Sequence, residues 1–97
     1  MKRIFISGGI TNVPDYMTEF KKAENELREI GYKSIINPAY INSHLPVDLS
    51  YDDYMAISIA ELSVCEAIYM LRNWKESKGA VREHRYASMN GLEIIYQ

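Results

Sequence analysis

The sequence predicts a small α/β domain in which helices cover both faces of a four-stranded parallel sheet. Four short apolar runs alternate with three longer helical patterns, and this alternation is typical of parallel strands joined by right-handed crossovers. The chain has 97 residues, which is enough for one core and too few for two. Apolar residues make up 47% of it, an ordinary share for a globular protein. We therefore expect a single domain over residues 1–97, with a three-layer αβα architecture.

Charge and cysteine content restrict the partners and the compartment. The formal net charge is -2 and the basic residues are scattered, which argues against a nucleic-acid partner, because phosphate binding needs a clustered basic face. The single cysteine, Cys65, has no internal disulfide partner and suits a reducing compartment. The apolar run at residues 1–6 is too short for a signal peptide or a membrane span. We expect a soluble, cytoplasmic protein without a membrane partner.

The first predicted strand, residues 3–7, runs directly into a glycine-containing turn. Two consecutive glycines allow a tight turn with exposed backbone N–H groups, which is a natural place for an anion. The turn matches neither the dinucleotide-binding fingerprint nor the Walker motif, so an ordinary strand-to-helix connection fits equally well. The candidate substrate-binding residues in this segment are Ser7, Gly8, Gly9, Ile10 and Thr11.

The next segment predicts a structural helix that begins at Pro14 and is capped by Gly31. Its apolar residues recur at steps of three and four, which places them on one face: Tyr16, Phe20, Ala23, Leu27 and Ile30. A second strand follows over residues 32–36 and ends at Asn37-Pro38. We expect residues 39–49 to form a loop, with His44 as polar surface.

A second long helix is predicted from Ser50 to about Val64. Ser50 and Asp53 have the spacing of a capping box. One stripe of this helix is apolar (Met55, Ile59 and Leu62) and a separate stripe carries Tyr51, Tyr54, Ser58 and Glu61. The second stripe either faces water or lines a pocket.

The last part of the chain predicts a buried strand, a polar loop, a capped helix and a final strand. The strands cover residues 66–71 and 92–96, and the helix covers residues 77–90 with Ser77 as its N-cap. A flavodoxin-like strand order, 2-1-3-4, would bring the carboxyl ends of the first and third strands together. The glycine turn, the loop at residues 72–74 and Ser77 would then surround one crevice.

Glu83 lies near the start of this last helix and close to the predicted crevice. From spacing alone, a glutamate among Lys78, Arg82 and Arg85 is more typical of a solvated surface. In a crevice, however, it could act as acid, base, nucleophile or metal ligand. The sequence shows no spaced pair of His or Cys ligands, no G-x-S-x-G elbow and no full glycine fingerprint, so we expect neither a metal nor another cofactor.

The chemistry that remains is attack of a carboxylate on an anomeric carbon. The sugar would be held covalently until water or another acceptor releases it. The tyrosines and Trp74 could stack on a nucleobase, and the glycine turn with Ser77 at a helix N-terminus could hold a 5′-phosphate.

The arrangement of motifs resembles the nucleoside 2-deoxyribosyltransferase-like superfamily, in its small phage and bacterial branch. The matching segments cover nearly the whole chain and are Ile6–Thr11, Asn37-Pro38, Tyr54-Met55, Cys65–Tyr69 and Trp74-x-x-Ser77-x-Gly79-Ala80-x-x-Glu83. The most specific part, Ser77-x-Gly79-x-x-x-Glu83, is similar to the motif of 2′-deoxynucleoside 5′-phosphate N-hydrolases. The resemblance implies the flavodoxin-like fold and a homodimer or larger homo-oligomer.

The same resemblance implies site residues. Glu83 would be the nucleophile on C1′ and Ser77 a phosphate ligand. The further positions that it marks as candidate substrate-binding residues are Asn37, Tyr54, Trp74 and Gly79. One position departs from the pattern, because Ser58 stands where relatives usually carry an aspartate that assists the base or orients the sugar. Serine is a far weaker acid. Glu61, one turn further, is a candidate substitute.

Three hypotheses follow from these observations. The favoured one is an enzyme that cleaves the N-glycosidic bond of a deoxynucleotide or nucleoside, by hydrolysis or transfer, with Glu83, Ser58 and Glu61 as candidate catalytic residues. The second is a module that binds a nucleotide or a nucleotide-derived signal without cleaving it. The third is a structural or partner-binding phage protein, suggested by the small size and the eight tyrosines.

Overall fold

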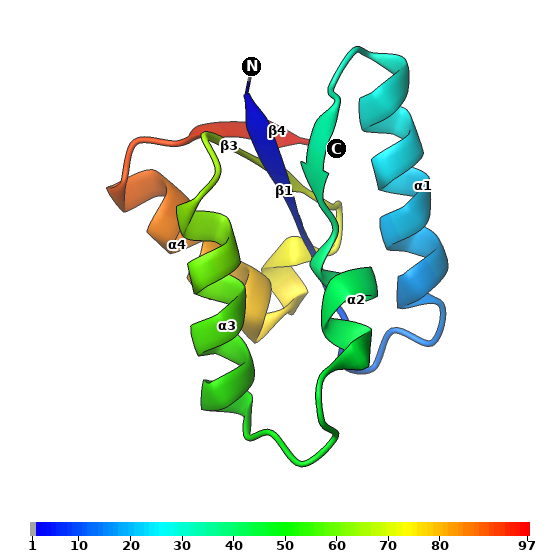
Figure 1. Ribbon diagram of the computed structural model, residues 1–97, viewed down its shortest axis with the longest axis vertical. Coiled ribbons are helices and arrows are strands. Elements are labelled where there is room, and N and C mark those ends of the chain that lie inside the picture. The colour runs from blue at the N-terminus through cyan, green and yellow to red at the C-terminus, as the bar shows by residue number, and fades with distance from the viewer. Residues whose placement is uncertain (1) are drawn as a thin grey trace.

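A computed structural model describes residues 2–97 as a four-stranded parallel sheet between two layers of helices (Figure 1). The strands are β1 (Arg3–Ser7), β2 (Ser34–Ile36), β3 (Ala67–Met70) and β4 (Glu93–Tyr96). The helices are α1 (Tyr16–Glu29), α2 (Pro38–Ile41), α3 (Tyr51–Ser63) and α4 (Lys78–Met89), with short 3-10 turns η1 (Asn42–His44) and η2 (Trp74–Glu76). The sheet order β2-β1-β3-β4 confirms the predicted α/β fold and its strand order.

Each face of the sheet has its own core because successive side chains of a strand point to opposite sides. Ile4 and Ile6 pack with Phe20 and Leu27 of α1, whereas Phe5 packs on the other face. That second cluster combines residues from β3, α3 and α4 and includes Leu62, Ile68, Met70, Ala80 and Ala87. Figure 1 accordingly shows α1 and α2 to the right of the sheet, and α3 and α4 to the left.

Local signals in the sequence account for most element boundaries. The capping box of α3 is present, with the Asp53 N–H donating to Ser50 Oγ at 3.0 Å and the Ser50 N–H donating to Asp53 Oδ2 at 3.3 Å. Gly31 and Gly91 follow α1 and α4 with φ of 110° and 71°, the left-handed conformation that ends many helices.

Two predictions about residues 14–49 were wrong. Helix α1 begins at Tyr16 instead of Pro14, because the backbone first turns twice, with the Val13 N–H donating to Ile10 O and the Tyr16 N–H to Val13 O. Residues 39–49 are not entirely loop, because they include most of α2 and all of η1. The side chain of Asn37 accepts from the Tyr40 N–H, and Pro38 occupies the first turn, which together start α2.

Candidate functional site

A cavity of about 350 Å³ opens where β1 ends and the first turns of α3 and α4 come together. Its walls come from the end of β1 and its following turn, from α1 and α2, from α3 with the loop before it, and from the start of α4. Its lining includes the apolar residues Phe20 and Pro38 and the polar residues Tyr54, Ser58 and Glu83. The volume lies within the range of small-molecule sites, about 300–1,000 Å³.

Glu83 is buried in this cavity, with 6% of its surface exposed. Its two carboxylate oxygens accept hydrogen bonds from two different elements. The Ser7 hydroxyl at the end of β1 donates to Oε1 at 2.6 Å, and the Ser58 hydroxyl on α3 donates to Oε2 at 2.5 Å. The carboxylate is therefore held in one orientation by the sheet on one side and by α3 on the other.

The surroundings of Glu83 change its acidity. Burial is the main effect and raises the pKa of the carboxyl, the two serine hydrogen bonds oppose it, and the negative charge of Glu61 adds to it. The resulting pKa is about 7. Glu83 therefore exchanges its proton near neutral pH, which is the range in which a carboxylate can serve as base, acid or nucleophile.

The polar stripe of α3 largely faces the cavity. Tyr51, Tyr54 and Ser58 all line it, so this part of the stripe does not simply face water. The ring of Tyr51 forms part of the rim, with Lys78 Nζ 4.9 Å and Arg82 Cζ 5.5 Å from its centre. These contacts join the start of α3 to the first two turns of α4 beside the cavity.

The start of α4 approaches the cavity closely because it lacks bulky side chains. Ser77 and Gly79 both line the cavity, and the Ser77 Oγ accepts from the Ala80 N–H as the N-cap. A Cβ on Gly79 would lie 3.2 Å from the sulfur of Met55. At Gly8, which also lines the cavity, a Cβ would lie 2.6 Å from the Leu71 side chain, so only glycine fits there.

Ile10 and Thr11, the last two residues of the predicted turn, also line the cavity. Gly9 does not; its N–H donates instead to Asn73 Oδ1 at 2.9 Å. Asn73 therefore joins the turn after β1 to the loop after β3.

Three other predicted site residues lie outside the cavity wall. Trp74 stacks on His84 of α4, with ring centres 4.2 Å apart, and packs against the core cluster that includes Ala80 and Ala87. Asn37 caps α2 and donates to Glu24 Oε1 at 3.1 Å, and Glu61 accepts from Asn42 Nδ2 at 3.0 Å. In each case a local partner holds the side chain, so direct contact with a ligand in the cavity would require it to move.

Sequence reasoning missed the partnership between Glu83 and its two serines. Ser7 was predicted to bind substrate, yet the structure shows its hydroxyl on the carboxylate. A signal for the burial of Glu83 was present: Ala80 and Ala87 lie three residues before and four residues after it, and small apolar residues at this spacing mark a packed helix face.

Among residues 2–97, no group of three or more His, Cys, Asp or Glu side chains is arranged to hold a metal ion. Within the same range, no helix has the length and apolar character needed to cross a membrane.

Comparison with known proteins gives one result. No curated protein matches the chain, and no solved structure matches it. The family model described as "Domain of unknown function (DUF4406)" matches residues 2–96. Because this match extends over nearly the whole sequence, the chain belongs to the DUF4406 family.

Proposed function

We propose that this protein cleaves the N-glycosidic bond of a deoxynucleotide or nucleoside, by hydrolysis or base transfer, through a covalent intermediate on Glu83. The observation that carries the proposal is the position of this carboxylate. It is buried in a cavity of nucleoside scale, both of its oxygens are oriented by hydroxyl groups, and it titrates near neutral pH.

The chemistry requires one carboxylate in its ionised form. An oxygen of Glu83 would attack C1′ of the sugar, while the C1′–N bond breaks and its electron pair leaves with the base. A water molecule would then attack C1′, release the carboxylate as leaving group and give up a proton. In a transfer reaction, a second base would take the place of water.

The serine hydrogen bonds serve this reaction in two ways. A carboxylate has about four lone-pair positions, so each oxygen keeps capacity to attack after accepting one hydroxyl. The hydroxyl donors also stabilise the charged form against the effect of burial. Ser7 and Ser58 are therefore positioning residues for Glu83 in this proposal.

The resemblance to the nucleoside 2-deoxyribosyltransferase-like superfamily supports the same assignment. It makes Glu83 the nucleophile and Ser77 a ligand of the 5′-phosphate. Ser77 lines the cavity at the N-terminus of the 12-residue helix α4, where backbone N–H groups favour an anion. Tyr51 and Tyr54 offer aromatic surface to a base or sugar in the same cavity.

A direct test is incubation of the protein with each deoxynucleoside and each deoxynucleoside monophosphate, followed by chromatography for free base. Release of base from at least one compound, together with a deoxyribosyl adduct on Glu83 in mass spectrometry of the quenched reaction, is the expected result. Absence of base release and of base exchange with every compound would contradict the proposal. Thermal stabilisation without base release would instead support a nucleotide-binding module.

A further inference from the structure

We infer that the preferred substrates are N-glycosides whose leaving base carries a positive charge, such as N7-alkylated purine or pyridinium nucleosides and their phosphates. The inference rests on the proposed function and names the substrate class of the same site. Two features of the cavity carry it: among residues 2–97, the buried carboxylate has no cationic partner, and no second carboxyl group lines the cavity.

The first feature is the charge balance around Glu83. Within residues 2–97, no lysine, arginine or histidine lines the cavity. Lys78 and Arg82 of α4 lie over the ring of Tyr51 instead, and Arg82 also pairs with Asp52 at 3.5 Å. An ionised, buried carboxylate held only by hydroxyl groups is costly, and a cation in the cavity would offset that cost.

The second feature is the set of groups that could protonate a departing base. The titratable side chains that line the cavity, among the residues described, are Glu83, Tyr51 and Tyr54. Glu83 is needed as the nucleophile, and the hydroxyls of Ser7 and Ser58 already donate to it. Burial raises the pKa of Tyr54, and the charges of Glu83 and Glu61 raise it further, which makes this phenol a weaker acid.

Glu61 does not supply the missing acid. Its carboxyl accepts from Asn42 Nδ2 at 3.0 Å and does not line the cavity. Burial raises its pKa, so it would hold a proton more readily than an exposed glutamate, but that proton has no direct path to a base in the cavity. The Ser58 hydroxyl, which faces the cavity from the same helix, donates to the nucleophile and is not an acid for the departing base.

A cationic base removes the need for such an acid. When Glu83 attacks C1′ of an N7-methylguanine glycoside, the C1′–N9 electron pair moves into the ring and cancels its positive charge. The base leaves as neutral N7-methylguanine without accepting a proton. A neutral guanine glycoside would have to leave as an anion or take a proton from a donor, and the cavity offers only weak ones.

The test compares 2′-deoxyguanosine with N7-methyl-2′-deoxyguanosine, which differ by one methyl group and one charge. General acid assistance is typically worth about 10²- to 10⁴-fold, so kcat/KM for the methylated compound should be at least about 100-fold higher. Each rate is measured as free base released, with the protein-free reaction subtracted. Equal rates, or faster cleavage of the neutral compound, would overturn the inference and leave the proposed function standing. Cleavage of neither compound would also overturn the inference, whereas the proposed function falls only if no deoxynucleoside or deoxynucleoside monophosphate releases its base.

A binding measurement gives a second, independent readout. The cationic nucleoside should bind the wild-type protein about tenfold more tightly than the neutral one, because it meets the buried carboxylate. In the Glu83→Gln variant, which keeps the side-chain shape and removes the charge, this preference should disappear. A preference that persists in Glu83→Gln, or equal affinities in the wild type, would count against a cationic substrate.

Discussion

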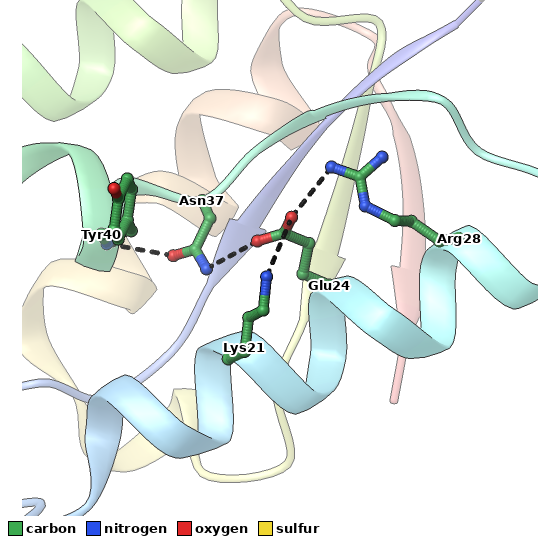
Figure 2. A network of polar contacts seen from close by, with 5 residues as sticks. All are labelled: Lys21, Glu24, Arg28, Asn37 and Tyr40. Atoms are coloured by element: carbon green, nitrogen blue, oxygen red, sulfur yellow. Dashed lines mark hydrogen bonds and ion pairs between the residues drawn. The ribbon is translucent and has the colours of Figure 1, made fainter.

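Two glutamates on opposite sides of the sheet show how differently one residue type can be used. Glu24, on α1, lies in a network of polar contacts with Lys21, Arg28 and Asn37 (Figure 2). The Arg28 guanidinium is 2.9 Å from Glu24 Oε2, and Lys21 Nζ is 3.8 Å from the same oxygen. Glu83, on α4, accepts hydrogen bonds from two serine hydroxyls, and no cation pairs with it in the part of the chain that the structure describes.

The two environments shift acidity in opposite directions. Burial alone would raise the pKa of Glu24, but hydrogen bonds from Arg28 and Asn37 and the positive charges of Lys21 and Arg28 outweigh it and lower that pKa. At Glu83, burial outweighs the serine hydrogen bonds and raises the pKa to about 7. Glu24 therefore stays charged and joins α1 to α2. Glu83, by contrast, is a buried carboxyl group that gains or loses its proton near neutral pH.

The largest expected effect is on turnover. Replacing Glu83 by Gln removes the nucleophile and should lower kcat by at least about 10³-fold on any substrate that the wild type cleaves. The matched control is Glu24→Gln, the same change on the other side of the sheet, which should leave kcat unchanged. Steady-state kinetics of both variants, with circular dichroism to verify folding, would separate the roles. An equal loss of kcat in Glu83→Gln and Glu24→Gln would show that Glu83 has no special role in catalysis.

The next effect concerns the free energy of unfolding as a function of pH. The folded-state pKa of Glu83 lies above its ordinary value of 4.5. Its contribution to the free energy of unfolding is therefore fully present below pH 4.5 and is lost as the pH rises through about 7. A shift of this size corresponds to about 3 kcal/mol. Glu83→Gln should therefore gain about that much stability relative to the wild type between pH 4 and pH 8, as measured by urea unfolding.

Glu24→Gln provides the opposite control in the same experiment. Because the folded-state pKa of Glu24 is lowered, its contribution is present above its ordinary pKa of 4.5 and is lost as the pH falls through the folded-state value. The deficit of Glu24→Gln relative to the wild type should therefore shrink on acidification. If the stability difference from the wild type changed with pH in the same direction for both variants, the opposite pKa shifts of Glu24 and Glu83 would be contradicted.

The smallest expected effect is on the pH profile of catalysis. In the wild type, kcat/KM should rise with pH as Glu83 ionises around pH 7. Ser58→Ala removes a donor to the charged form, so the rising limb should move about one pH unit higher. Ser63→Ala is the matched control, because its hydroxyl donates to Ala60 O on the exposed side of α3. An unchanged limb in Ser58→Ala would show that this hydrogen bond does not tune Glu83.

The fold followed from local signals that do not depend on distant contacts. The capping box at Ser50 and the glycines after α1 and α4 marked helix ends correctly, and the apolar runs at residues 3–7 and 66–71 became central strands. Helix α2 was missed because Asn37-Pro38 was interpreted only as the end of a strand. The same pair is also a good helix start, with an N-cap followed by proline.

The site was harder to predict, because it depends on which groups meet across the sheet. Spacing alone favoured an exposed Glu83; its burial follows from the packing of Ala80 and Ala87 against β-strand residues on the same face. Trp74 was expected beside a nucleobase, but it lies outside the cavity wall, where its ring stacks on His84 and packs against the second core cluster. Stacking between a residue of a short turn and a residue of a helix cannot be predicted from the spacing of apolar residues in the sequence.

That stack also equips the protein with a built-in optical probe. The chain has one tryptophan, Trp74, and its indole lies face to face with the imidazole of the residue that follows Glu83. The emission of a single fluorophore in this position would report how firmly η2 is seated on α4. Unfolding could thus be followed at this helix without attaching a label.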